Sequence, residues 1–118
     1  MTVKSQIDVV GLGQCSLDIL GQLEVYPQLD QKAELSSLLL QGGGPVATAL
    51  VTLARLGVSV AMLGAVGDDN FGQQIQDGLM AEGVDCTLLA KDPGCSSQAA
   101  FIAVDGEVLD ARAVDVIA

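Results

Sequence analysis

Residues 41–57 have the sequence QGGGPVATALVTLARLG, in which three consecutive glycines stand immediately before an apolar repeat. The repeat has a period of about 3.6 residues and predicts a buried helix that begins at Gly44 and ends at Gly57 as its C-terminal cap. Its apolar positions are Val46, Leu50, Leu53 and Leu56. Because glycine loses more conformational freedom on folding than any other residue, the triple glycine indicates a tight turn or a ligand that approaches the backbone closely.

Apolar runs on both sides of this helix predict buried strands at residues 7–13 and 58–67. A second helix is predicted after Asp69, which is a favourable N-cap residue, and it ends at Gly83. The alternation of strands with helices predicts a mainly parallel α/β sheet with right-handed crossovers. The fold class is therefore α/β.

Ligands of such sheets bind beyond the carboxyl ends of the strands. Residues 11–18, the triple glycine and residues 64–69 follow those ends, so we expect the three loops to converge on one crevice. Asp18 is expected in the loop after the first strand. A carboxylate there is commonly a solvated or turn-forming residue, but one facing glycine backbone can also accept hydrogen bonds from the hydroxyls of a sugar.

Other segments predict strands that lie apart from the parallel sheet. Residues 17–25 alternate between apolar and polar side chains, and with residues 32–41 they are expected to form an antiparallel pair. Residues 84–90 and 96–105 also predict strands, separated by a turn at Asp92-Pro93-Gly94.

Two nucleotide-binding motifs fit the glycines poorly. Residues 11–16, GLGQCS, place Ser16 where the dinucleotide motif has its third glycine, and the residues that follow alternate like a strand. The triple glycine is followed by Pro45 and Val46, with no Gly-Lys-Ser/Thr to complete a P-loop. A helix amino terminus that presents N–H donors to a hydroxyl-rich ligand is the remaining interpretation.

The composition argues against several classes of function. The net charge of -10 disfavours nucleic acid as a partner, and no apolar stretch reaches the ~20 residues of a membrane helix. The amino end lacks the features of a signal peptide, so we expect a soluble, cytoplasmic protein. The chain has no histidine, so we expect no metal site and no Ser-His-Asp or Cys-His nucleophile. Its cysteines are Cys15, Cys86 and Cys95, and we expect them to be reduced and to act as small apolar side chains.

Taken together, several segments resemble one family. A strand leads to Asp18, Gly43 and Gly44 open a helix that ends in ARLG, and residues 64–72 (GAVGDDNFG) and 81–85 (AEGVD) follow in order. This combination resembles the amino-terminal part of the ribokinase-like (PfkB-type) carbohydrate kinases over about residues 5–105. The resemblance implies a three-layer α/β fold with a partial parallel sheet and a small β-sheet lid, all within one domain spanning residues 1–118.

The resemblance also implies roles for particular residues. The lid strands would be residues 17–25, 33–40, 86–90 and 97–104. Asp18 would bind sugar hydroxyls, and the backbone of Gly43 and Gly44 would contact the same sugar. Thr48 stands where many members have a substrate-contacting Asn, while Ala99 and Phe101 would face the sugar or simply pack within the lid. Asp68 and Asp69 would cap a helix and order a turn.

The family phosphorylates a sugar hydroxyl with ATP and Mg2+, but its catalytic base, anion hole and most of its ATP site lie in a carboxyl-terminal half that this chain does not resemble. The tail at residues 106–118 is also shorter than the connection usual in the family. We therefore expect a sugar-binding half with no catalytic residues that is inactive alone, and a homodimer or larger homo-oligomer that covers the open edge and face of its sheet. The alternatives are a non-catalytic sugar-binding or oligomerisation module and a fragment with no function of its own.

Overall fold

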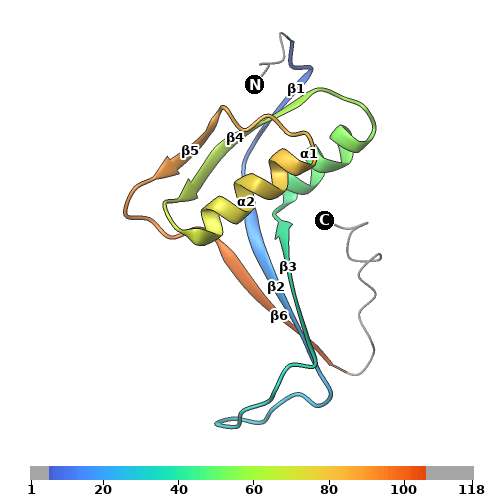
Figure 1. Ribbon diagram of the computed structural model, residues 1–118, viewed down its shortest axis with the longest axis vertical. Helices are drawn as coiled ribbons and strands as arrows, with labels where there is room; N and C mark the ends of the chain where they lie inside the picture. Colours follow the sequence, from blue (N-terminus) through green and yellow to red (C-terminus); the bar gives the residue numbers. More distant parts are fainter. Residues whose placement is uncertain (1–5, 106–118) are drawn as a thin grey trace.

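The computed structural model describes residues 6–105, which form two helices and two separate β-sheets (Figure 1). In chain order the elements are β1 (Val9–Leu12), β2 (Ser16–Leu23), β3 (Ser37–Gly43), α1 (Pro45–Arg55), β4 (Val60–Gly67), α2 (Asn70–Ala81), β5 (Leu89–Asp92) and β6 (Ala99–Asp105). The expectation for the tail at residues 106–118 lies outside the described residues. Neither described helix is long and apolar enough to cross a lipid bilayer.

The first sheet is parallel and has the strand order β1-β4-β5. Val9 of β1 lies opposite Val60 of β4, and Gly64 of β4 lies opposite Leu89 of β5. Helix α1 follows β3 and leads into β4, and α2 connects β4 to β5, so the predicted alternation of helix and strand is confirmed in this part of the chain. Strand β4 is the central strand, as its apolar sequence predicts.

Helix α1 begins and ends where the sequence predicts. Gly44 is the N-cap with a φ of 98°, and Gly57 has a φ of 89° just after the C-cap. Two hydrogen bonds close the carboxyl end in a Schellman motif, from Gly57 N to Ala54 O at 3.0 Å and from Val58 N to Leu53 O at 3.0 Å. Leu50 is buried as expected, but Leu56 is 75% exposed because it stands at the C-cap, past the helical turn that packs on the sheet.

Helix α2 is capped by Asp69, as predicted. The side chain of Asp69 accepts a hydrogen bond from Gly72 N at 2.8 Å, which satisfies one of the free N–H groups of the first turn. Ile75 and Leu79 face the interior and are 3% and 5% exposed. Gly83, with a φ of 85°, follows the last turn and allows the chain to reverse towards β5.

Both helices pack against one face of the first sheet. Val60 and Met62 of β4 are fully buried in the same apolar cluster as Leu50 of α1 and Leu79 of α2. The opposite face is open in the part of the chain that the structure describes, since Val10 and Leu12 are 50% and 73% exposed. The described residues therefore supply the sheet and one helical layer of the expected three-layer arrangement.

The prediction that residues 7–13 form a buried strand is only half right. The strand exists, but all of its side-chain-bearing residues are exposed. Among the described strands β1 pairs only with β4, so it is an edge strand with one open face. The sequence of a short apolar strand does not show whether other elements of the protein cover it.

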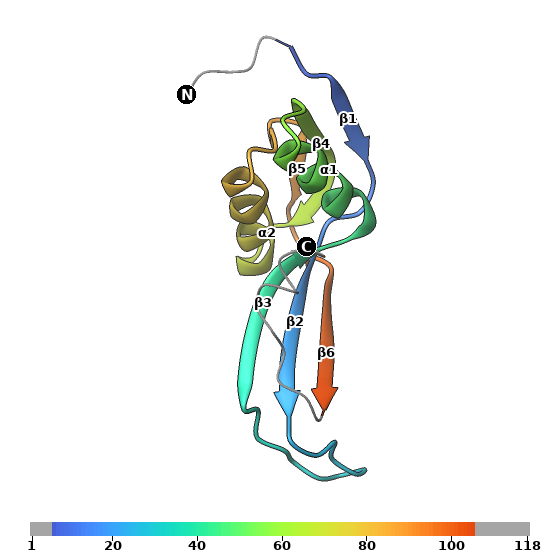
Figure 2. The same cartoon turned by 90° about the vertical axis from the view of Figure 1, so that its right-hand side faces the viewer.

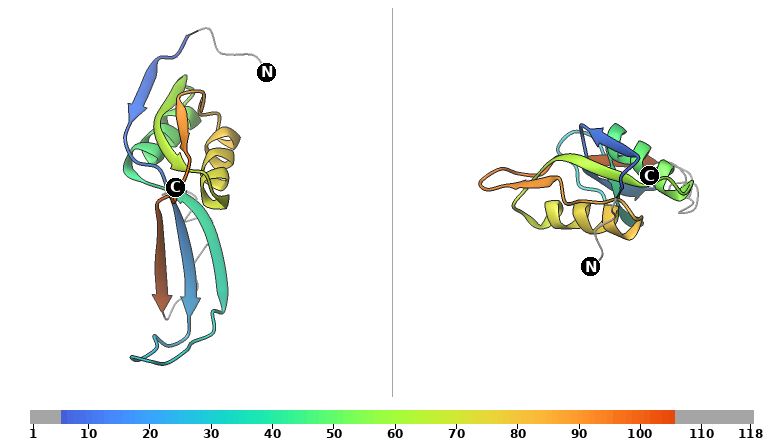
Figure 3. Two further views of the ribbon diagram at one scale, coloured as in Figure 1. Left: turned by 90° about the vertical axis from the view of Figure 1, so that its left-hand side faces the viewer. Right: turned by 90° about the horizontal axis from the view of Figure 1, so that it is seen from above.

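The second sheet has the order β3-β2-β6 and extends away from the helices (Figures 2 and 3). Strands β2 and β3 are antiparallel, as predicted for residues 17–25 and 33–40, while β6 runs parallel to β2. The sheet thus contains three of the four segments that the family resemblance assigns to a lid.

The fourth segment, residues 86–90, was predicted for the second sheet, and this is wrong. The strand there is β5, which begins at Leu89 and pairs with β4 in the first sheet. Val84 and Leu89 are buried in the core beneath α2, and a bridge between Ala61 and Asp85 already aligns the chain with β4. This burial fixes the choice of sheet, because a short apolar strand fits either one.

Candidate sugar-binding site

Asp18 and Gly43 lie in direct contact, which is the central feature of the site. A Cβ atom built on Gly43 would lie 2.8 Å from the carboxyl carbon of Asp18. Gly43 therefore leaves room for a carboxylate of the same chain, so a side chain at position 43 would displace it. Asp18 lies within β2, in the strand predicted at residues 17–25 and not in the loop before it, and is opposite Gln41 of β3 and Ala100 of β6.

The other two glycines of the triple glycine have surroundings that differ from those of Gly43. Gly44 has a positive φ, and a Cβ atom there would lie 2.7 Å from the carbonyl oxygen of Gln14. The same oxygen accepts a hydrogen bond from Ala47 N at 3.3 Å, so one N–H group of the first turn of α1 already has a partner. Gly42 has no atom within 4 Å of its Cβ position and is open.

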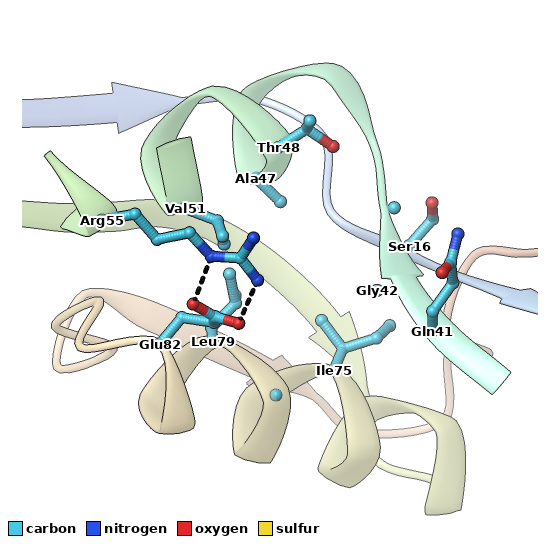
Figure 4. Close-up of a pocket in the computed structure, with 12 residues that line it drawn as sticks. Ser16, Gln41, Gly42, Ala47, Thr48, Val51, Arg55, Ile75, Leu79 and Glu82 are labelled. Carbon is cyan, nitrogen blue, oxygen red and sulfur yellow. Dashed lines mark hydrogen bonds and ion pairs between the residues drawn. The ribbon is translucent and has the colours of Figure 1, made fainter. Parts of the chain in front are cut away.

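Thr48 of α1 faces a pocket of about 160 Å³ that opens beside Gly43 (Figure 4). One end of the pocket is polar, with Ser16 and Gln41 from the second sheet. Its floor is apolar and is formed by Ala47, Val51, Ile75 and Leu79. Polar groups at one end and apolar walls at the other are typical of small-molecule sites.

Gln41 supplies an unused hydrogen-bonding group at this pocket. Its side-chain Oε1 atom is buried and has no hydrogen-bond partner among the described residues. Buried polar atoms are almost always paired in folded proteins, so an unpaired acceptor at a pocket wall is suited to a donor on a ligand. Sequence reasoning missed Gln41, although it is the polar residue nearest to the triple glycine.

An ion pair closes the far end of the pocket and joins the two helices. Arg55 Nη2 lies 2.6 Å from Glu82 Oε1, and Arg55 Nε donates to Glu82 Oε2 at 2.9 Å (Figure 4). The hydrogen bonds from Arg55 lower the pKa of Glu82. Because Arg55 is paired with Glu82, its positive charge is neutralised within the pocket.

Ala99 and Phe101 do not join Asp18, because they lie on the opposite face of the second sheet. A Cβ atom on Gly21 would lie 3.0 Å from Phe101 Cζ, and Gly21 faces away from Asp18 on the same strand. The neighbours in β6 that share the face of Asp18 are Ala100, paired with it, and Ile102, paired with Leu20. Alternation along β6 defines these two sets, but only the register with β2 shows which set faces Asp18.

The three loops expected to converge on one crevice border two separate pockets. The triple glycine contributes to the pocket beside Thr48, whereas residues 13–15 and 65–67 line a second pocket of about 350 Å³. The second pocket lies at the carboxyl ends of β1, β4 and β5 and is completed by Asp92 and residues 95–98. Strand β2 begins between the two pockets, and the buried Cys15 and Ser16 separate them.

The three cysteines are free and differ in surroundings. Cys15 is buried in the core and Cys86 packs against it; burial, followed by the charge of Asp85, raises the pKa of Cys86 to about 11. Cys95 is free and exposed, and its Sγ donates to Asp92 Oδ2 at 3.2 Å, so it does not act as the small apolar side chain that was expected. Within residues 6–105 no group of three or more carboxylates and cysteines is placed to bind a metal ion.

Comparisons with known proteins agree with this fold. The family model described as pfkB family carbohydrate kinase matches residues 7–114. Ribokinase from Bacillus subtilis is 37% identical over 73 residues, covering 62% of this chain and 25% of that protein. Fructokinase from Escherichia coli is 40% identical over 70 residues, covering 59% of this chain and 21% of that protein.

Solved structures give the same result. Fructokinase from Halothermothrix orenii superposes with a TM-score of 0.69 and 29% identity, covering 82% of this chain and 34% of that chain. The fold is ribokinase-like, and the chain belongs to the pfkB family of carbohydrate kinases. It spans about a quarter of the length of the curated relatives that it matches.

Proposed function

We propose that this chain is the sugar-binding part of a carbohydrate kinase that phosphorylates a sugar hydroxyl with ATP. The contact between the Asp18 carboxylate and Gly43 carries the proposal, because Gly43 lines the pocket and brings this acceptor next to it, although Asp18 itself is not one of the lining residues. The Oε1 atom of Gln41 and the hydroxyl groups of Ser16 and Thr48 add further hydrogen-bonding groups there. A group of acceptors and hydroxyls suits a ligand with several hydroxyl groups.

We further propose that Ala100 and Ile102 form an apolar wall of the same site, in place of Ala99 and Phe101. Both residues share the face of Asp18 on the second sheet. With this change, all of the proposed sugar-binding residues lie on one side of that sheet or on the first turn of α1. In this proposal the second sheet acts as a lid over the sugar.

The pocket beside Gly43 does not fit the ATP part of the reaction. A triphosphate needs backbone N–H groups and cations, but the carboxylate of Asp18 occupies the space over Gly43, and Arg55 is paired with Glu82. A ribokinase from Cryptococcus neoformans, which is similar in fold, was solved in complex with ADP. The present chain matches only 30% of that protein, so most of that protein has no counterpart here. We therefore propose that ATP and Mg2+ bind residues beyond this chain and that the chain alone has no kinase activity.

Titration calorimetry with pentoses, hexoses and nucleosides tests sugar binding. We expect saturable binding of one of these classes, weakened about tenfold or more by Asp18→Asn because hydrogen bonds to a charged acceptor are lost. Asp8→Asn is the matched control, since Asp8 is an exposed aspartate at the start of β1. Equal binding by both variants would contradict the role of Asp18. A coupled ADP-release assay should show no turnover by the chain alone.

A second candidate function is a non-catalytic sugar-binding or oligomerisation module. The poor fit of a triphosphate to the pocket beside Gly43 favours it as much as it favours a half-enzyme. An effect of ATP on sugar affinity would argue against the module, whereas sugar binding that ATP leaves unchanged would support it.

We also propose a cytoplasmic homodimer or larger homo-oligomer. The face of the second sheet opposite Asp18 is apolar and open, with Leu38 and Phe101 57% and 59% exposed. Light scattering should show more than one copy, and Phe101→Ser should shift the mass towards the monomer. A monomer at all accessible concentrations would contradict this proposal.

A further inference from the structure

The chain passes from the first sheet to the second through residues 95–98, directly before β6. Unlike the entry to β2, where Cys15 and Leu17 are buried in the core, this segment has mostly exposed side chains. Its position is instead determined by hydrogen bonds to the loop between β4 and α2.

Ser97 makes three of these hydrogen bonds. Its Oγ donates to Asp69 Oδ1 at 2.6 Å and accepts from Gly67 N at 2.9 Å, and its backbone N donates to Asp69 Oδ2 at 2.9 Å. Asp69 also caps α2 through Gly72 N. One serine and one aspartate therefore tie three features together: the end of β4, the start of α2 and the start of β6.

Two glycines let the segment lie flat against this loop. A Cβ atom on Gly67 would lie 2.6 Å from Ser97 N, and one on Gly72 would lie 2.8 Å from Ser97 Oγ. Both glycines belong to the sequence GDDNFG at residues 67–72, so the glycines and Asp69 of that motif are all used at this contact. The N-cap role predicted for Asp69 accounts for only one of its hydrogen bonds.

The position of Ser97 matters because β6 begins two residues later. Ala100 and Ile102 lie on the face of Asp18, and their distance from α1 depends on where the chain leaves the first sheet to begin β6. Leu17 N donates to Gln98 O at 3.0 Å, which aligns β6 with β2 but does not attach it to the loop after β4.

We infer that Ser97 is a positioning residue: through Asp69 and Gly67 it fixes the start of β6 and, with it, the wall of the sugar site formed by Ala100 and Ile102. The first half of this inference concerns the fold alone, whereas the second half rests on the proposed function. No contact between Ser97 and the sugar is implied, since Ser97 lines the other pocket.

Amide hydrogen exchange in the 118-residue chain tests the first half. Ser97→Ala should speed exchange in β6 by roughly tenfold, as expected when two side-chain hydrogen bonds are lost, while exchange in α1 and β4 stays unchanged. Ser96→Ala is the matched control, because Ser96 is exposed and precedes Ser97 directly. Ser97→Thr keeps the hydroxyl and should restore slow exchange in β6.

A second variant separates this contact from the cap of α2. Asp69→Asn keeps an oxygen for Gly72 N, since asparagine is as good an N-cap as aspartate, but its amide nitrogen cannot accept from Ser97 N. It should therefore speed exchange in β6 more than in α2. Two results in both variants would overturn the inference. One is unchanged exchange in β6, and the other is an equal increase of exchange in α1, β4 and β6.

Sugar affinity tests the second half independently. If the parent chain binds sugar, Ser97→Ala should weaken binding about threefold to tenfold, with Ser96→Ala as before. If exchange in β6 responds but the parent binds no sugar, then the proposed function is wrong while the role of Ser97 in positioning β6 stands. If the parent binds sugar and Ser97→Ala changes neither affinity nor exchange, the inference is wrong and the proposed function stands.

Discussion

The two sheets of this molecule obtain their stability in different ways. In the first sheet, Val60 and Met62 of β4 are fully buried and pack beneath two helices. In the second sheet, only the residues near the start of β2 join that core, while Leu38, Leu40 and Phe101 are 57%, 42% and 59% exposed. The comparison shows a packed scaffold that carries a thin sheet, and the candidate site lies where the two meet.

The largest expected effect tests the packed scaffold. Leu50→Ala should lower the free energy of unfolding by about 2–5 kcal/mol, because Leu50 is 2% exposed and its loss leaves a cavity between α1 and β4. Leu38→Ala is the matched control in the second sheet and should cost less than about 0.5 kcal/mol. Urea denaturation measures both. Similar losses for the two variants would remove the distinction between the sheets.

A glycine pair at the junction should give the next largest effect. Gly43→Ala places a methyl group on the Asp18 carboxylate and should destabilise the fold by about 1–3 kcal/mol, with loss of sugar binding. Gly42→Ala should be nearly neutral in both measurements, since the space around its Cβ position is empty. If the two alanine variants behave alike, the contact between Asp18 and Gly43 does not define the site.

A pH dependence distinguishes the hydrogen-bonded connection from apolar packing. Hydrogen bonds from Ser97, and then from Gly72, lower the pKa of Asp69. A lowered pKa in the folded state means that Asp69 contributes stability above its unfolded value of about 3.9, and that this contribution is lost as the pH falls through the folded value. The unfolding midpoint of the parent should therefore fall more between about pH 5 and pH 2 than that of Asp69→Asn. Parallel pH profiles would contradict this.

The smallest expected effect concerns the ion pair between the helices. Arg55 and Glu82 have side chains that are 45% and 33% exposed, so their pair should contribute only about 0.2–1 kcal/mol. A double-mutant cycle with Arg55→Gln and Glu82→Gln measures this coupling, and it should decrease in high salt. A coupling well above that range would mean that the helices depend on this pair and not on Leu50 and its neighbours.

Sequence signals predicted the local structure well. The apolar period of α1, its closing Gly57 and the Asp69 cap of α2 are interactions between residues within about one helical turn, so the sequence carries them directly. The α/β class followed from the order of these elements. The resemblance to PfkB-type kinases was confirmed because several such segments occur in the right order.

Three details of the site were not available from sequence. Asp18 was linked to the loop after the first strand but lies inside β2, and Gln41 was not proposed as a site residue. Ala99 and Phe101 were chosen where Ala100 and Ile102 face Asp18, because a strand pattern gives two alternating sets and not the side that each set faces. Strand β5 was assigned to the wrong sheet for a related reason, since its partner β4 lies beyond the whole of α2.

The sequence by itself thus determined the order of helices and strands, how the helices are capped and which family the chain resembles. Only the tertiary structure decided which strands are partners, which face Asp18 shares with β6 and how Ser97 attaches β6 to Asp69. The physical reason is distance along the chain. Helix periods and caps act between near neighbours, whereas the register of β6 against β2 joins residues about eighty positions apart and depends on packing that no local pattern encodes.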